Sequence, residues 1–215
     1  MKIFLDTGDV EAVRRAADTG LLDGVTTNPS HIARTGRKFR DTVKEICGLI
    51  AGPVSAEVLS ETADGMVREA QEVAAIAPNV VVKIPMTVEG MKAVPILEGE
   101  KDIKTNVTMV FSAAQTLLAM KAGATFVSIV LSRLDAVGSE SEILVQDAAA
   151  IRDNYTFDSE IIAGSVKTQN QVLACLRVGI DIATVNPDLF FQMFQHPLTD
   201  GGLAQFANDW KKVPK

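Results

Sequence analysis

Eight short apolar segments recur along the chain, and stretches with helical periodicity separate them. Most of the segments are rich in β-branched residues and lack a clean polar alternation, as parallel strands covered on both faces do. The expected strands span residues 3–6, 24–27, 54–59, 80–85, 103–108, 126–131, 160–165 and 181–186.

The intervening stretches, such as VEAVRRAADTG and SAAQTLLAMKAG, read as amphipathic helices, and several end in a Gly that can cap a helix C-terminus. Strand followed by helix, repeated eight times, predicts an α/β fold, the single (β/α)₈ TIM barrel. An open doubly wound sheet is the alternative. It would ordinarily have fewer strands and a Gly-rich phosphate loop after the first strand, where this chain has LDTGD.

A chain of 215 residues suits one well-buried core, so we expect one barrel domain over residues 1–215. A helix is expected around residues 187–195. In the last segment, Leu203, Phe206 and Trp210 have helical spacing, which predicts an extra C-terminal helix at about 200–212. This helix could dock on its own barrel or on a neighbouring copy.

Composition excludes several classes of protein. The formal net charge is −6, which gives no electrostatic basis for binding nucleic acid or an anionic membrane. Asp6 and Asp9 lie where a signal peptide would need apolar residues, and no apolar run approaches a spanning helix, so we expect a cytoplasmic protein. Cys47 and Cys175 lie in helical patterns without nearby His, which favours reduced packing residues over a zinc site.

Lys83 is the most informative single residue, because it lies within the apolar run VVVKIP. Lys is almost never fully buried without a partner. Desolvation favours the neutral amine, which is the form that acts as a nucleophile. The alternative is a lysine whose ammonium extends past the barrel rim into water.

Other expected strands also carry polar residues near their C-terminal ends, where barrel enzymes keep their active sites. One such residue could be a helix cap or a rim residue, but so many at equivalent places are hard to explain by structure alone. They are Asp6, Thr26, Asn28, Glu57, Asn106, Thr108, Ser128, Arg133, Ser165 and Lys167.

The motifs at the strand ends resemble those of the transaldolase family, particularly its short bacterial and archaeal branch. They are LDT, GVTTNPS, VVKIPMT, NVT followed by FS, RLD and GSVKT, together with the closing HPLTDGGLAQFANDWKK. The resemblance covers nearly the whole chain. It implies a barrel, a reaction on a sugar phosphate or another anionic ketose, and catalysis by a Schiff-base lysine without metal or cofactor.

The resemblance also implies a role for each matching residue. Lys83 matches the lysine that attacks the ketose carbonyl, and Asp6 matches the general acid/base. Glu57 and Thr108 match the pair that holds the water used in forming and hydrolysing the carbinolamine. From the residues alone, Asp6 could instead cap the following helix and Thr108 could be a simple strand residue.

Substrate contacts follow in the same way. Thr26, next to the GVTTNPS turn, is counted among the substrate-binding residues. Three residues match groups that bind the hydroxyls of the donor unit: Asn28, Asn106 and Ser128. Three match the anion pocket for the terminal phosphate: Arg133, Ser165 and Lys167.

The family contains transaldolases, which pass a dihydroxyacetone unit to an acceptor sugar, and fructose 6-phosphate aldolases, which release it free. Transaldolases carry Glu in the third strand and Asn-x-Thr in the fifth, whereas the aldolases carry Gln in the third and a Tyr on the sixth. Glu57, Asn106 with Thr108, and Val130 here favour the transferase. A non-catalytic barrel is a third class, which the full set of strand-end residues disfavours.

Three positions depart from the family pattern. The usual aromatic-containing segment before Arg133 is Ile129–Ser132, Asn186 replaces a common Pro, and His31 follows TTNPS at a usually apolar position. His31 either faces the site or is an exposed helix residue. These changes raise the hypothesis of a modified donor such as sulfofructose. The resemblance also implies a homo-oligomer, a pentamer or decamer.

Overall fold

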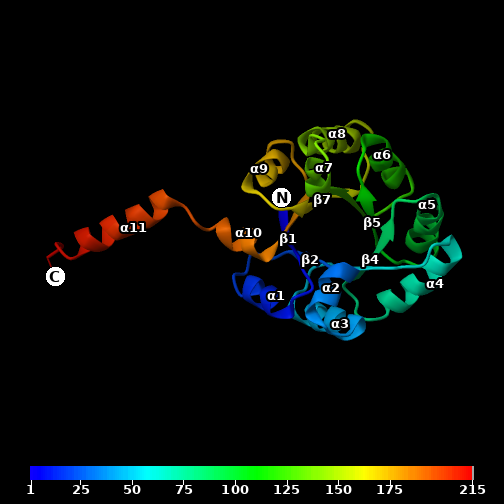
Figure 1. Cartoon of the computed structure of the whole chain (residues 1–215), viewed down its shortest axis with the longest axis horizontal. Helices are drawn as coiled ribbons and strands as arrows, with labels where there is room; N and C mark the ends of the chain where they lie inside the picture. Colours follow the sequence, from blue (N-terminus) through cyan, green and yellow to red (C-terminus); the bar gives the residue numbers. More distant parts are fainter. Residues whose placement is uncertain (215) are drawn as a thin grey trace.

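The computed structural model describes residues 1–214, which form a closed barrel of eight parallel strands in the order β1 to β8 (Figure 1). The last strand pairs with the first, with Leu5 opposite Val185, which closes the sheet. The strands are β1 (Lys2–Asp6), β2 (Gly24–Thr26), β3 (Val54–Glu57), β4 (Val80–Pro85), β5 (Thr105–Val110), β6 (Phe126–Val130), β7 (Glu160–Val166) and β8 (Ile182–Val185).

Helices follow each strand and cover the outside of the barrel, so the predicted (β/α)₈ fold is confirmed. Sequence patterns placed the strands within about two residues of their observed ends. The helices are α1 (Val10–Ala17), α2 (Pro29–Thr35), α3 (Phe39–Leu49), α4 (Ala63–Ala74), α5 (Val88–Pro95), a π-helical turn η1 (Ile96–Glu100), α6 (Ala113–Lys121), α7 (Leu131–Ala136), α8 (Ser141–Asn154), α9 (Gln169–Arg177), α10 (Pro187–Gln192) and α11 (Pro197–Trp210).

The two faces of each strand have different neighbours. Val80, Val82 and Ile84 of β4 belong to the main core between the sheet and its helices, whereas Val81 belongs to a separate cluster inside the barrel. Because side chains alternate along a strand, Lys83 shares the inner face with Val81. The residues of the inner cluster are Phe4, Val81, Phe126, Ile162 and Ile182.

The same alternation places a layer of polar side chains, here called the polar layer, next to the inner apolar cluster and nearer the C-terminal ends of the strands. Asp6 lies two residues beyond Phe4, Lys83 two beyond Val81, and Ser128 two beyond Phe126. Parallel strands carry their C-terminal ends to one end of the barrel, so these polar side chains meet there. The fold therefore brings Asp6, Lys83 and Ser128, which are far apart in the sequence, to the same end of the barrel.

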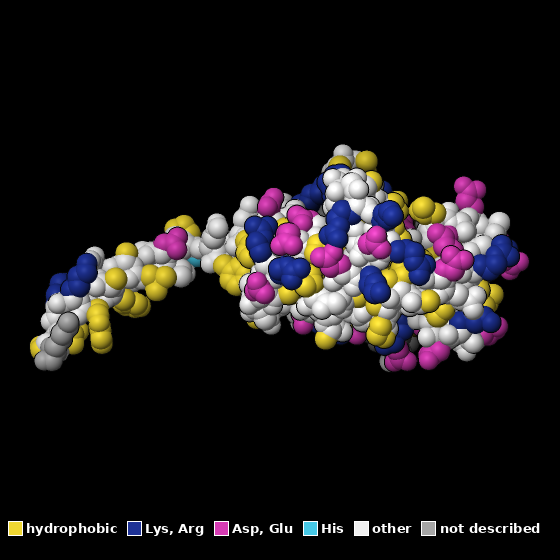
Figure 2. Space-filling model, turned by 90° about the horizontal axis from the view of Figure 1, so that it is seen from below, with side chains coloured by type: hydrophobic (Ala, Val, Ile, Leu, Met, Phe, Trp, Pro, Cys, Tyr) yellow, Lys and Arg dark blue, Asp and Glu magenta, His cyan; other side chains and the backbone are white. Residues whose placement is uncertain are grey.

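The final helix is present as expected, but it projects away from the barrel after α10 (Figure 1). None of its residues is buried. Figure 2 shows apolar side chains gathered along it, and its exposed large residues are Leu198, Leu203, Phe206 and Trp210.

Candidate functional site

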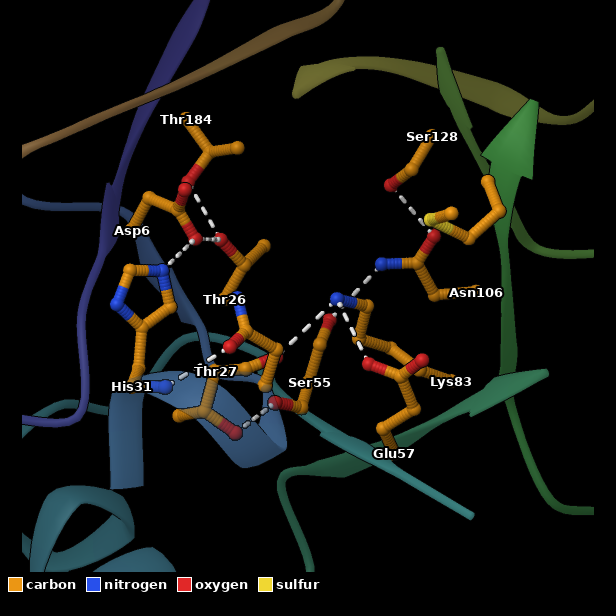
Figure 3. A network of polar contacts seen from close by, with 12 residues as sticks. Asp6, Thr26, Thr27, His31, Ser55, Glu57, Lys83, Asn106, Ser128 and Thr184 are labelled. Atoms are coloured by element: carbon orange, nitrogen blue, oxygen red, sulfur yellow. Dashed lines mark hydrogen bonds and ion pairs between the residues drawn. The ribbon is translucent and has the colours of Figure 1, made fainter. Parts of the chain in front are cut away.

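Lys83 lies inside the barrel with only 7% of its surface exposed, so its ammonium does not extend past the rim. Its Nζ donates to the carbonyl oxygen of Thr27 at 3.1 Å and lies 3.5 Å from Oε2 of Glu57 (Figure 3). Glu57 and Lys83 are direct neighbours in the β3–β4 register. At that separation, opposite charges attract by roughly 1 to 5 kcal/mol, for an effective dielectric constant between 80 and 20. That attraction offsets part of the cost of burying the amine.

Asp6 lies at the end of β1, three strands away from β4 around the barrel. Its Oδ1 accepts a hydrogen bond from Oγ1 of Thr26 at 3.0 Å, and Thr26 also bonds the hydroxyl of Thr184 at 2.7 Å. Asp6 does not cap α1, because Asp9 does so through its own side chain. The hydroxyl of Thr26 thus holds the carboxylate of Asp6, and Thr184 in turn supports Thr26 (Figure 3).

A second polar chain crosses β3, β5 and β6. Nδ2 of Asn106 donates to Oγ of Ser55 at 3.1 Å, and Oγ of Ser128 donates to Oδ1 of Asn106 at 2.7 Å. Asn106 is fully buried and is the register neighbour of Lys83. These bonds fix the amide orientation, because Oδ1 must accept and Nδ2 must donate.

Two other predicted residues lie close to this centre. Thr108 is buried on β5, on the same inner face as Asn106 and opposite Pro85 of β4. Asn28 caps α2, since its Oδ1 accepts from the backbone N–H of His31 at 2.9 Å. The cap fixes the start of α2 at the barrel rim.

The residues predicted to hold a phosphate lie at the rim. Arg133 of α7 is exposed, and its Nη1 donates to Sδ of Met109 at 3.6 Å. Lys167 is exposed just after β7, and Ser165 is half-buried. Ser165 is linked to α7 by Oγ of Ser132, which donates to its carbonyl oxygen at 2.5 Å.

Gln171 of α9 ties this rim together. Its Oε1 accepts from the backbone N–H of Lys167 at 2.8 Å, and its Nε2 donates to Oδ2 of Asp135 at 2.6 Å. Burial acts to raise the pKa of Asp135, but hydrogen bonds from Ser141 and Gln171 outweigh burial and hold that pKa below its usual value. Asp135 therefore stays ionised and anchors the loop after β7.

Backbone irregularities mark the ends of two strands. Met109 and Ser165 have φ values of 63° and 55°, in the left-handed region that non-glycine residues rarely adopt. Each lies where the strand register shifts, between Val107 and Val110 on β5 and between Ala163 and Val166 on β7. Bulges of this kind redirect side chains next to active sites.

In residues 1–214, no group of three or more His, Cys, Asp or Glu side chains is placed to hold a metal ion. Within the same range, no helix is long and apolar enough to cross a membrane.

Comparison with known proteins identifies the family of the chain. The family model described as Transaldolase/Fructose-6-phosphate aldolase matches residues 3–215. The chain belongs to this family. Two curated relatives, each named probable transaldolase, are 52% identical to it over 215 residues. The one from Geobacter metallireducens is matched over 100% of both chains, and the one from Aquifex aeolicus over 100% of this chain and 99% of its own.

Solved structures show the fold alone. Thiamine phosphate pyrophosphorylase from Pyrococcus furiosus superposes with a TM-score of 0.58 at 17% identity, covering 86% of this chain and 85% of that one. The barrel is thus shared with a protein of distant sequence, while the family membership rests on the sequence matches.

Sequence reasoning missed two residues of the polar layer in this transaldolase/aldolase family member. Ser55 and Thr184 bind Asn106 and Thr26, yet each looks like an ordinary strand residue. The period of two gave an available signal, because Ser55 lies two residues before Glu57 and Thr184 two after Ile182. His31, left open between two interpretations, has its ring facing Asp6 at 3.4 Å.

Proposed function

We propose that the chain is a class I transaldolase that moves a dihydroxyacetone unit from a ketose phosphate, or a related anionic ketose, to an aldose phosphate. The observation that carries the proposal is the buried Lys83 amine, 3.5 Å from Glu57, on the inner face of the barrel that also holds Asp6. An amine nucleophile at this place can attack the carbonyl carbon of a ketose bound in the barrel mouth.

The reaction begins when Nζ of Lys83 adds to the ketose carbonyl. Glu57 and Thr108 hold the water that leaves as the carbinolamine becomes an iminium. Asp6 then takes the proton of the hydroxyl on the far carbon of the bond to be cleaved, the carbon that becomes the aldehyde. The carbon–carbon bond breaks, its electrons flow into the iminium, and the aldose departs. An acceptor aldehyde reverses these steps, Asp6 returns the proton, and water releases the new ketose.

Binding groups for the donor come from the second polar chain. Asn106 and Ser128, together with Asn28 and Thr26, offer hydrogen bonds to the hydroxyls of the three-carbon unit. The rigid hydrogen bonds of Asn106 support this role because a preorganised group loses little entropy on binding. Arg133, Lys167 and Ser165 are proposed to bind the terminal phosphate at the rim.

Schiff-base trapping tests the mechanism. The protein is mixed with dihydroxyacetone, reduced with borohydride and digested, and the mass of the Lys83 peptide is measured. We expect an adduct in the native chain and in Lys92→Met, whose lysine is an exposed residue of α5, and none in Lys83→Met. An unmodified Lys83 peptide in the native chain would overturn the proposal.

Transfer and lysis are separated by the acceptor. With fructose 6-phosphate as donor and erythrose 4-phosphate as acceptor, we expect a seven-carbon ketose phosphate and glyceraldehyde 3-phosphate as products, and little free dihydroxyacetone when the acceptor is omitted. Release of dihydroxyacetone without acceptor at the same rate would assign the lyase activity instead.

Sulfofructose as donor in the same assay tests the hypothesis of a modified donor, which is based on the unusual segment Ile129–Ser132. Equal or faster turnover of fructose 6-phosphate would remove that hypothesis.

We further propose that the chain forms a homo-oligomer, a pentamer or decamer, through α11. The support is the apolar face of a helix that buries none of its own residues, including Phe206 and Trp210 at 69% and 76% exposure. Light scattering is expected to give a mass several times 23.0 kDa, and Phe206→Glu with Trp210→Glu to lower it. A native monomer would contradict the proposal.

We also propose the cytoplasm as the compartment. The two cysteines, Cys47 and Cys175, are not joined in a disulfide, which fits the reducing conditions there.

A further inference from the structure

His31 is placed next to the catalytic carboxylate by the way α2 begins. Asn28 caps the helix and Pro29 fixes its first turn, so His31 lies three residues after the cap. Helical side chains lean toward the helix N-terminus, which here is the barrel rim. The imidazole consequently reaches back over the end of β1 rather than into solvent, and it faces Asp6 in Figure 3.

Both ring nitrogens of His31 have partners. Nε2 lies 3.4 Å from Oδ1 of Asp6, and the two side chains are each only 19% exposed. Nδ1 lies within hydrogen-bonding distance of Nη2 of Arg34, one helical turn further along α2. Arg34, His31 and Asp6 thus form a line from the outside of α2 to the mouth of the barrel.

The partners determine where the imidazole proton lies. A guanidinium group can only donate hydrogen bonds, so Nδ1 of His31 must accept from Arg34. The neutral ring then carries its proton on Nε2, which faces Asp6. Arg34 thereby selects the tautomer that can donate to the carboxylate.

Within residues 1–214, the polar contacts of the Asp6 side chain fall on the same oxygen. Oδ1 is approached by Oγ1 of Thr26 at 3.0 Å and by Nε2 of His31 at 3.4 Å. Since Thr26 uses its hydroxyl hydrogen on Asp6, the hydroxyl of Thr184 must donate to Thr26. With the hydroxyl of Thr26 donating to Oδ1 and Nε2 of His31 facing that same oxygen at 3.4 Å, Oδ2 is left as the oxygen that meets the substrate hydroxyl.

We infer that His31, held in one tautomer by Arg34, is a positioning residue that orients the Asp6 carboxylate for proton transfer; this inference rests on the proposed transaldolase reaction. His31 does not touch the reacting atoms. It holds Oδ1 so that Oδ2 is aimed at the donor hydroxyl whose proton must leave as the carbon–carbon bond breaks. Because this proton moves only after the iminium exists, His31 acts on turnover and not on formation of the Lys83 adduct.

Four variants separate this role from a general structural one. His31→Met keeps the size of the side chain but removes the donor, whereas His31→Gln keeps a terminal N–H that can reach Asp6. Arg34→Met frees Nδ1. Arg37→Met is the matched control, because Arg37 lines the same cleft of about 560 Å³ but pairs with Glu45 instead of His31.

For His31→Met we expect kcat to fall by roughly tenfold to a hundredfold with KM little changed, as for the loss of a polar contact with a charged group. His31→Gln should recover most of that activity, Arg34→Met should lie between, and Arg37→Met should match the native chain. Trapping of dihydroxyacetone on Lys83 should be equal in all of them, and thermal unfolding confirms that each is folded.

The outcomes are distinct. If the native chain forms no adduct on Lys83, the proposed function fails. If adducts form normally but His31→Met turns over at the native rate, the role of His31 is overturned while the Schiff-base chemistry stands. A raised KM with unchanged kcat would also overturn it, because that result identifies His31 as a group that binds substrate.

Discussion

Ser132→Ala should weaken binding of a phosphorylated donor without slowing the chemistry. Oγ of Ser132 donates to the carbonyl oxygen of Ser165 at 2.5 Å, and Ser165 has the unfavourable φ of 55°. A non-glycine residue in that region costs about 1 kcal/mol or more, so the surrounding structure must hold it in place. Ser132 supplies part of that support, joining α7 to the end of β7.

The expected size follows from the bond that is lost. One neutral hydrogen bond contributes about 0.5 to 1.5 kcal/mol net. If that energy holds Ser165 in its phosphate-binding position, the KM for fructose 6-phosphate rises by roughly twofold to tenfold. The value of kcat stays the same, because the phosphate lies far from the bond that breaks and binds ground state and transition state alike.

Steady-state kinetics with fructose 6-phosphate and with unphosphorylated fructose provide the assay. Ser139→Ala is the matched control, since Ser139 is exposed in the loop after α7. The increase in KM should be confined to the phosphorylated donor. An equal increase for fructose, or a fall in kcat at constant KM, would refute the link between Ser132 and the phosphate site.

Two further predictions concern the folded state. Glu98 accepts four hydrogen bonds from the backbone N–H and hydroxyl groups of Thr105 and Thr125. Thr105 begins β5 and Thr125 directly precedes β6. Glu98→Ala should therefore lower the free energy of unfolding by about 2 to 4 kcal/mol, and Glu98→Gln should lower it by about 1 kcal/mol. Urea titration measures both, and equal losses would contradict the assignment. Burial raises the pKa of the Cys47 thiol to about 11 and that of Cys175 to about 12, so at pH 8 fewer than roughly one thiol in a thousand is a thiolate. A disulfide reagent should therefore label both only after unfolding, and fast labelling of either thiol in the native protein would show that it is not buried.

Much of the fold was predictable because local pattern and global architecture agree. The β-branched runs identified all eight strands, and the strand-end polar residues indicated the end of the barrel where the candidate site lies. The sequence pattern did not predict correctly where β6 ends. The expected strand reached Leu131, but α7 begins there, in the turn where Ser132 bonds Ser165. That bond joins segments 33 residues apart, which no local pattern records.

The site was less completely predictable. Lys83 could be singled out because a charge in an apolar strand is costly, but Ser55 and Thr184 are small polar residues of a kind common in strands. The left-handed backbone of Met109 and Ser165 depends on register shifts between strands and has no sequence signal of its own. Asn186, an unusual residue at the end of β8, proves to cap α10 through a bond of 2.7 Å to Leu189 N.

The hydrogen-bonded chain of Ser55, Asn106 and Ser128 limits how this barrel can change by mutation. Both the oxygen and the nitrogen of the Asn106 amide are hydrogen-bonded to protein partners. Replacing Asn106 would therefore leave the buried hydroxyls of Ser55 and Ser128 each without this hydrogen bond. Single replacements along the chain should each be harmful, whereas a coordinated exchange of all three could be tolerated. Redesign of this enzyme toward other donors is therefore more accessible at the open rim than on the inner wall beside Lys83.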